Sequence, residues 1–390
     1  MKKEKSILFH YSILNVGGAE RSLLRLMRYL SDKGWDVFLV LTAGGGTLED
    51  EIDPRVHVYH LRSIAAGNQF KRASTLLERI INFPDLCLYG ITRIEEYIKS
   101  IFLFSKYRFD AAAISLHGLS PKFVCRFIRA KCKIQWIRND LSLCDPEQKA
   151  QNNIAQYKNC LDHFVCVSQT AERSLNTLFP ELQNRTSTVY NIIAPEEMKK
   201  LAEDGKAPEM ENTPSFLKVV TVCRLSDKAK GLLRMVSVHS RLDQEGIDFQ
   251  WFIVGDGPDK EKMQIAINKA GLTDKMILLG SRENPFPYYK SADISATLSY
   301  YEGLCGAVNE AKVLGKPVIA TEFSGIYEQI EDGETGIIVA NNEEAILNGM
   351  RQLLCNSELR EKLSCAKLPK EIMDDDHKID KLIDIIEGRY

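Results

Sequence analysis

Short apolar runs of strand length alternate along the chain with longer stretches that have helical spacing. In the first half the apolar runs are SILFHYSIL, VFLVLTA, AAAISL, KIQWI and HFVCVS. Between the first two, residues 19–34 place Leu23, Leu24, Met27 and Leu30 on one side of a helix. Strands that alternate with helices predict a parallel, doubly wound sheet.

The alternation stops at a polar stretch, residues 194–215, which contains three prolines. It restarts with LKVVTVCRL, FQWFIVG, MILLG, ADISATLS, VIAT and GIIV, which helix-length segments separate. We therefore predict an α/β protein of two tandem Rossmann-like domains that face a cleft. They span residues 1–200 and 201–370, and a C-terminal helix over 371–390 packs back on the first. The acids Asp374–Asp376 of that helix are interpreted as complements of its dipole. Ligands of such sheets bind beyond the carboxyl ends of the strands.

Composition is typical of a globular protein of this size, with 44% apolar residues in 390. Residues 1–200 hold 28 Lys and Arg against 21 Asp and Glu, and the remainder 23 against 32. Either the two halves meet different partners or the surface is unevenly charged.

The ten cysteines form no CxxC pair, which predicts a reduced compartment and no structural zinc. The opening MKKEKSILFHYSIL is interpreted as a first strand and not as a signal peptide, because its apolar run is short and contains His10.

Cations follow the first strand of the second half. Arg224 comes directly after VVTVC, and Lys228 and Lys230 are expected in the loop beyond it. Cations between the end of a strand and a helix are well placed to bind a diphosphate. Taken alone, these charges are equally typical of a solvated loop.

Two more loops of the second half follow strands. In FIVGDGPDK, Gly255 and Gly257 are predicted to let the backbone approach a ligand, and Pro258 to take the first helical position. The third glycine of a GxGxxG dinucleotide fingerprint is absent. Ser281, after MILLG, lies in a loop whose backbone is a candidate partner for the edge of a base, or a plain connection.

Two glutamates lie close together in YYEGLCGAVNEAKVLGKPVIAT. If a helix begins between Leu304 and Ala307, its free N–H groups form an anion site. Glu310 then lies in its first turns and Glu302 in the loop before it. A carboxylate beside a diphosphate is repulsive unless it binds hydroxyl groups, so we expect sugar and ribose hydroxyls as its partners.

The first half has weaker candidates. Gly17 and Gly18 lie between the first strand and its helix. His117 follows AISL, and Arg138 and Asp140 follow the strand KIQWI. A single histidine is more often structural than functional.

In this order and spacing, these residues resemble the retaining glycosyltransferases of the GT-B fold, in the large family 4 (glycosyl transferases group 1). Glu302 and Glu310 match the family's E-x7-E pair, with GKPVIAT following. Arg224 and Lys230 match its Arg…Lys-Gly pair, although one extra residue between them leaves Lys228 as a second candidate. The glycine pair at 17 and 18 matches its N-terminal glycine loop.

The resemblance also implies roles. Arg224 and Lys230 would hold the donor diphosphate and stabilise its developing charge, Glu302 would hold the transferred sugar, and His117 would approach that sugar. The other implied donor-binding residues are Gly17, Gly18, Gly255, Ser281, Gly303, Leu304, Cys305, Gly306 and Glu310, the last for the ribose. Neither a metal nor another cofactor is expected. Arg138 stands where relatives often have histidine, and Cys305 where they often have glycine.

The implied function is transfer of a hexose or N-acetylhexosamine, with retention, from a nucleoside-diphosphate sugar to a glycan or lipid-linked sugar acceptor. UDP is the favoured donor nucleotide and GDP the second. The setting would be cell-surface polysaccharide synthesis, and no nucleic-acid partner is expected. The alternatives are another nucleotide-sugar enzyme, such as a 2-epimerase, and a catalytically silent binding subunit. An NAD-dependent dehydrogenase is disfavoured by the missing fingerprint.

Residues 69–109 mix Leu, Ile, Phe and Tyr with seven Lys and Arg against four Asp and Glu. A basic amphipathic region of this kind is typical of a surface that rests on anionic lipid. We hypothesise a cytoplasmic protein in peripheral contact with the inner face of the plasma membrane. Ordinary core helices with solvated charges are the alternative.

Overall fold

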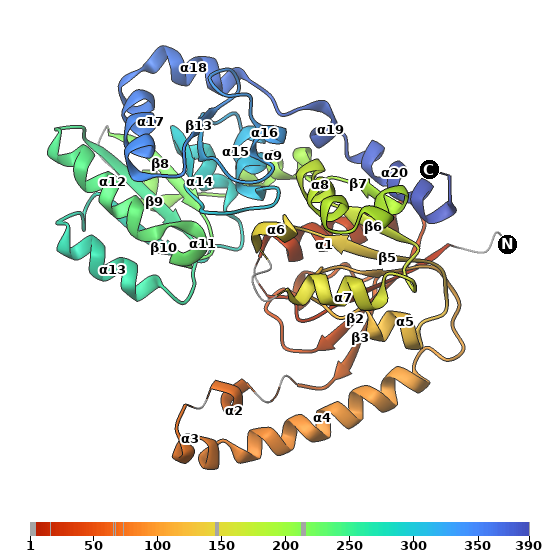
Figure 1. Ribbon diagram of the computed structural model, residues 1–390. Helices are drawn as coiled ribbons and strands as arrows, with labels where there is room; N and C mark the ends of the chain where they lie inside the picture. The colour runs from red at the N-terminus through yellow and green to blue at the C-terminus, as the bar shows by residue number, and fades with distance from the viewer. Residues whose placement is uncertain are drawn as a thin grey trace. The chain divides into compact units, whose positions relative to one another are not determined.

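The computed structural model describes residues 5–15, 17–64, 66, 68–72, 74–144, 148–211 and 216–389. The chain forms two compact units (Figure 1). The N-terminal unit comprises Met1–Val167, Glu172–Ile192 and Asp376–Tyr390, and the C-terminal unit comprises Ser168–Ala171 and Ile193–Asp375.

The N-terminal unit is built on a parallel sheet in the order β3-β2-β1-β4-β5-β6-β7. Its strands are β1 (Ser6–Tyr11), β2 (Asp36–Ala43), β3 (His57–Arg62), β4 (Phe109–Ile114), β5 (Ala130–Ile137), β6 (His163–Cys166) and β7 (Thr186–Thr188). The inner strand β1 pairs with both β2 and β4. Ile7, Leu8 and Phe9 of β1 are completely buried, as expected for a parallel strand with both faces covered.

The helices of this unit are, in chain order, α1 (Gly18–Asp32), η1 (Glu49–Glu51), α2 (Asn68–Arg72), α3 (Leu76–Ile81), α4 (Phe83–Phe102), α5 (Lys122–Phe127), α6 (Leu141–Cys144), α7 (Lys149–Tyr157), α8 (Gln169–Leu178, whose first turn is grouped with the other unit), η2 (Pro180–Arg185) and α20 (Asp375–Glu387). Helix α1 buries the predicted apolar stripe, including Leu23, Met27 and Leu30.

The C-terminal unit repeats the plan with a parallel sheet in the order β10-β9-β8-β11-β12-β13. Its strands are β8 (Leu217–Val222), β9 (Phe249–Val254), β10 (Met276–Gly280), β11 (Ile294–Thr297), β12 (Val318–Thr321) and β13 (Ile337–Val339). Its helices are α9 (Pro195–Asp204), α10 (Pro208–Glu211), α11 (Asp227–Lys230), α12 (Leu232–Gln244), α13 (Lys260–Lys269), α14 (Phe286–Ser291), α15 (Gly306–Val313), α16 (Ile326–Gln329), α17 (Glu343–Cys355), α18 (Ser357–Cys365) and α19 (Lys370–Met373).

Two groups of helices pack in this unit. Helix α12 packs with α13 and α17, while α14 and α15 pack with α9. The first group buries Trp251 and Phe249 of β9 in one apolar cluster with Met235 and Ile346. The predicted fold class, two doubly wound Rossmann-like sheets, is confirmed.

Every apolar run interpreted as a strand forms one, but two strands had not been predicted. In β3 (HVYHLR) two histidines and an arginine interrupt the apolar residues, and β7 (TST) has no apolar residue. The polar stretch 194–215 holds two helices, α9 and α10, and its residues 212–215 lie outside the described residues.

One local prediction is wrong and another is incomplete. Pro258 precedes α13, which begins at Lys260, because the turn is held by hydrogen bonds from the Asp259 N–H to the Leu225 carbonyl (3.0 Å) and from the Leu225 N–H to the Asp256 carbonyl (2.9 Å). Asp375 is not simply a dipole complement. Its carboxylate accepts the backbone N–H groups of residues 193 (3.0 Å) and 194 (2.7 Å), so it ties together the two segments in which the chain passes between the units.

Candidate active site

The sheet order of the C-terminal unit reverses between β8 and β11, so the loops after these two strands diverge at the carboxyl edge. Arg224 lies two residues beyond β8 and is exposed. Lys228 and Lys230 do not lie in an open loop, as predicted, but in the short helix α11. The N–H of Tyr300, in the loop after β11, donates to the carbonyl of Ala229 in α11 (2.8 Å), which joins the two loops.

Lys230 and Glu302 form an ion pair at this junction. Their side chains are only 21% and 17% exposed. Burial alone lowers the pKa of a lysine, but the Glu302 carboxylate outweighs burial and raises the pKa of Lys230 above its ordinary value. The same oxygen, Glu302 Oε1, accepts the hydroxyl of Ser299 (2.8 Å). Because Lys228 is exposed, Lys230 is the lysine that the fold directs to the glutamate.

The loop after β11 leads into α15, which begins at Gly306. The predicted helix start is thus confirmed, with Glu310 inside the helix and Glu302 in the loop ahead of it. Leu304 and Cys305 are buried, whereas Gly306 is exposed. The first turn of an eight-residue helix here presents backbone N–H groups at the carboxyl edge of the sheet.

The peptide groups of Cys305 are already bonded. Gln329, which is completely buried, accepts the Cys305 N–H through Oε1 (3.0 Å) and donates Nε2 to the Cys305 carbonyl (2.8 Å) and to Asn309 Oδ1 (2.5 Å). The resemblance implies that the backbone from Gly303 to Gly306 holds the transferred sugar and its phosphate, but the Cys305 N–H is engaged by Gln329 in this structure. Burial, followed by the charge of Glu302, raises the pKa of the Cys305 thiol to about 12, so the thiol stays protonated at neutral pH.

Glu310 has a partner within the same unit. The hydroxyl of Tyr289, from α14, donates to Glu310 Oε2 (3.3 Å). Tyr289 is completely buried, and burial followed by the Glu310 charge raises the pKa of its phenol well above the usual value. The phenol is thus a fixed donor that orients the carboxylate.

Several residues that support the loop after β11 had not been predicted. Arg234 is only 3% exposed. It donates Nε to the Leu298 carbonyl (3.0 Å) and Nη1 to Asn341 Oδ1 (2.5 Å). Its guanidinium stacks over the Tyr300 ring, with Cζ 3.9 Å from the ring centroid. The hydroxyl of Thr321 donates to the Ser299 carbonyl (2.6 Å). Arg234 lies in α12 and Gln329 ends the four-residue helix α16, and nothing in the sequence marks either residue as the support of a loop.

Gly255 was predicted to approach a ligand, but its backbone approaches the protein itself. With φ of +145°, a Cβ atom at this position would lie 1.9 Å from the Cys223 carbonyl oxygen. The glycine is therefore required for β9 to pass next to the segment that carries Arg224. Its predicted contact with the donor remains a prediction. Ser281 is exposed directly after β10.

The remaining predicted residues belong to the N-terminal unit. Gly17 caps the first turn of α1, which begins at Gly18. His117 lies in a turn after β4, and its Nδ1 accepts the backbone N–H of Arg138 (3.3 Å). This bond orients the imidazole relative to the end of β5.

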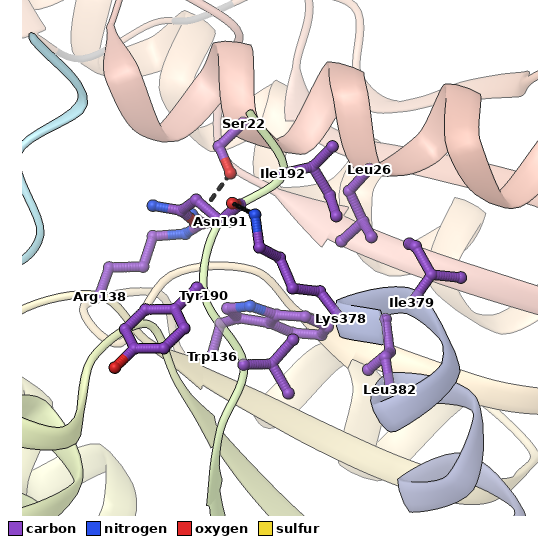
Figure 2. A pocket seen from close by; sticks show the side chains of 11 residues that line it. Ser22, Leu26, Trp136, Arg138, Tyr190, Asn191, Ile192, Lys378, Ile379 and Leu382 are labelled. Carbon is purple, nitrogen blue, oxygen red and sulfur yellow. Dashed lines mark hydrogen bonds between the residues drawn. The ribbon is translucent and has the colours of Figure 1, made fainter. Parts of the chain in front are cut away.

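A small pocket of the N-terminal unit lies beside the end of β5. Figure 2 shows Ser22 and Arg138 converging on Asn191, with Lys378 of α20 reaching the same residue. The Ser22 hydroxyl (2.8 Å) and Arg138 Nη1 (3.2 Å) donate to Asn191 Oδ1, and Lys378 Nζ donates to the Asn191 carbonyl (2.9 Å). Arg138 also donates Nε to the Ser115 carbonyl (2.7 Å), and burial lowers its pKa. Arg138 therefore holds together the ends of β4 and β5.

Comparison with known proteins gives a family and a fold. Residues 207–367 match the model of the glycosyl transferases group 1. An N-acetylgalactosamine-N,N'-diacetylbacillosaminyl-diphospho-undecaprenol 4-alpha-N-acetylgalactosaminyltransferase from Campylobacter jejuni is 29% identical over 144 residues, 36% of this chain and 38% of that protein. An uncharacterized glycosyltransferase from Haemophilus influenzae is 23% identical over 387 residues, 97% of this chain and 98% of that protein.

The structural likeness extends over the whole chain. The crystal structure of HepE from Anabaena in complex with UDP superposes with a TM-score of 0.70 at 16% identity, covering 98% of this chain and 100% of HepE. The first relatives found by sequence are matched over only 38% to 40% of their length. The match to the glycosyl transferases group 1 therefore lies in the C-terminal unit, over residues 207–367, and the two doubly wound sheets of the chain are those of the predicted GT-B fold.

Proposed function

We propose that this protein is a retaining glycosyltransferase of family 4, which moves a hexose or N-acetylhexosamine from a UDP-sugar to a glycan or lipid-linked sugar acceptor. The observation that carries the proposal is the Lys230–Glu302 ion pair ahead of the first turn of α15, with Glu310 inside that helix. The cation and the helix N-terminus suit a diphosphate, and the two carboxylates suit hydroxyl groups.

The ion pair is compatible with a bound diphosphate. An ammonium group has three donors, and Glu302 occupies one of them, which leaves two for phosphate oxygens. Arg224, exposed at the same edge, adds the planar fork that binds phosphate best. Because Glu302 Oε1 accepts both Lys230 and Ser299, we assign Oε2 to a hydroxyl of the transferred sugar.

In this mechanism the bond between the sugar C1 and the diphosphate breaks while the acceptor oxygen bonds to C1 on the same face. The acceptor proton passes to the leaving diphosphate. Arg224 and Lys230 stabilise the negative charge that develops on the leaving group, an effect typically worth about 10²–10³ in turnover per donor. His117 is assigned to the transferred sugar and Glu310 to the ribose.

The donor nucleotide and the acceptor rest on the relatives. HepE was crystallised with UDP, which supports uridine over guanosine. The Campylobacter jejuni relative is named for an acceptor on diphospho-undecaprenol, which supports a lipid-linked sugar as acceptor here. Cell-surface polysaccharide synthesis at the inner face of the plasma membrane is the corresponding setting.

The deciding experiment compares thermal shifts with UDP, GDP, ADP and NAD on the wild type and on Glu310→Ala. A ligand at about 100 times its Kd stabilises the native state by about 2.7 kcal/mol. We expect a shift with UDP that Glu310→Ala reduces because the ribose loses its carboxylate. Glu322→Ala, an exposed glutamate of the same unit, is the matched control and retains the shift.

A shift with GDP in place of UDP would change the base and leave the mechanism intact. No shift with any nucleoside diphosphate would overturn the proposal and favour a silent binding subunit. Release of UDP from a UDP-sugar with inversion at C1, followed by NMR, would overturn the retaining mechanism alone.

A further inference from the structure

Helix α4 of the N-terminal unit is inverted: its polar side chains face the protein. Its buried residues are Thr92 and Ser100. On the same side, Glu96 accepts Arg62 Nε (2.6 Å) and Glu95 accepts the Ser63 N–H (3.0 Å), both just past or at the end of β3. By contrast, α1 of the same unit buries leucines and methionine, as an ordinary surface helix does.

The opposite side of α4 is apolar and exposed, and α3 continues it. Figure 1 shows α4 (orange) as a long helix beyond β3, with α2 and α3 at its first end. Its outward residues are between 50% (Ile98) and 77% (Leu76) exposed. They are Leu76, Leu77, Ile80 and Ile81 of α3 and Phe83, Ile91, Ile94, Tyr97, Ile98 and Phe102 of α4. We call these ten residues the arm face.

An apolar surface of this extent is not typical of a protein that stays in water. Single exposed apolar residues are ordinary, but ten large exposed side chains along two consecutive helices mark a surface that something covers. No helix among the described residues has the length and apolar character needed to cross a bilayer. A helix whose apolar face remains exposed is suited instead to lie in the plane of a membrane interface.

The charges near the arm face indicate which surface covers it. The acids of α4 are engaged on the protein side: Asp85 accepts the N–H of Gln69 (2.9 Å), and Glu95 and Glu96 have the partners given above. The basic residues Arg79, Lys106 and Arg108 are exposed around the arm. Glu78 of α3 is exposed, but its carboxylate accepts the backbone N–H groups of Ser74 (2.7 Å) and Thr75 (3.2 Å). Exposed apolar side chains with exposed cations on the same segment complement a bilayer interface that carries anionic headgroups.

We propose that the arm face, Leu76 to Phe102, inserts into the interface of an anionic bilayer and holds the N-terminal unit against it. The polar side chains of α4 anchor the helix to the protein, which leaves its apolar side chains available to contact lipid. This inference deepens the proposed function, because it places the protein on the surface where a lipid-linked acceptor resides. Only the presence of a lipid-linked acceptor at that surface rests on the proposed function.

The test is flotation of the full chain with vesicles of phosphatidylcholine that contain about 30% phosphatidylglycerol, compared with phosphatidylcholine alone. We expect the protein to float with the anionic vesicles, and to float less when NaCl is raised from about 0.1 M to about 1 M. The variant Ile94→Glu/Ile98→Glu should bind at least tenfold more weakly. Ile265→Glu is the matched control, since Ile265 on α13 is 49% exposed against 50% for Ile98, and it should float like the wild type.

The melting temperature of each variant confirms its folding, and the UDP-induced thermal shift is measured on the same samples. Retained UDP binding with lost flotation in the double variant separates the arm from the donor site. Wild-type protein that does not float, or a double variant that floats unchanged, overturns the proposal whether or not UDP binds. A wild-type dimer in sedimentation velocity that the double variant turns into a monomer would overturn it in favour of a second copy as the occupant of the arm face.

Discussion

In the C-terminal unit, buried polar side chains hydrogen-bond to the loop between β11 and α15 and fix its conformation. In the N-terminal unit, by contrast, the polar side chains of α4 bind the helix to the rest of the protein, and its apolar side chains are exposed. Arg234 and Gln329 are almost completely buried, and each makes at least two hydrogen bonds to or beside that loop. On α4 the polar contacts to Arg62 and Ser63 also lie on the protein side.

The two regions use the same interactions for different ends. Buried hydrogen bonds are costly to leave unmade, so a loop held by them stays in one conformation. Such a loop presents the Glu302 carboxylate and the N-terminus of α15 at fixed positions, as a catalytic site needs. On α4 the same kind of bonds fixes the orientation of a helix whose other face remains available to a partner.

The largest expected effect is on turnover, and it concerns a residue assigned to the reaction and not to the support of the loop. Arg224→Ala removes the exposed guanidinium at the end of β8, and we expect turnover to fall by about 10²–10³ with little change in melting temperature. Lys228→Ala, four residues away and also exposed, is the matched control and should change turnover by less than about threefold. Steady-state release of UDP from the donor sugar measures both. Near-wild-type turnover of Arg224→Ala would refute the assignment of this arginine to the diphosphate.

The next effect concerns the support alone. Gln329→Leu leaves the N–H and the carbonyl of Cys305 buried without their partner, which should cost about 2–4 kcal/mol of local stability. Hydrogen exchange of peptides that cover α15 measures this cost in the full chain. Gln264→Leu removes a glutamine that bonds Asn268 on the surface of α13 and should cost only a few tenths of a kcal/mol. Unchanged protection of α15 in Gln329→Leu would show that other contacts hold the loop.

The elements around the candidate site could be predicted where its charged residues directly follow or precede an apolar run. The strand that ends before Arg224, and the helix that begins between Glu302 and Glu310, follow from apolar runs and from a glycine-containing turn. Prediction from the sequence failed where a side chain acts on a distant segment: Gln329 lies 24 residues from Cys305, and Arg234 lies 64 residues from Leu298. The edge strand β3 was missed because two histidines and an arginine interrupt its apolar residues.

Periodicity also left the orientation of α4 undetermined. A period of 3.6 residues shows that a helix has two faces, but not which of them meets the protein. For α1 the usual assumption, apolar side inward, is correct. For α4 it is wrong, because Glu95 and Glu96 meet partners at the end of β3 that no local pattern reveals.

The smallest effect tests that inversion directly. In an ordinary surface helix, loss of an outward glutamate costs little and loss of an inward isoleucine costs much. In α4 the order should reverse: Glu96→Ala loses the contact with Arg62, whose side chain is 12% exposed, and should cost about 1–2 kcal/mol. Ile91→Glu, on the arm face, should change stability by less than about 0.5 kcal/mol in the absence of lipid. Hydrogen exchange of α4 peptides measures both variants. A larger loss of protection in Ile91→Glu than in Glu96→Ala would mean that the apolar side of α4 packs against the protein, and that the arm face is not available to a membrane.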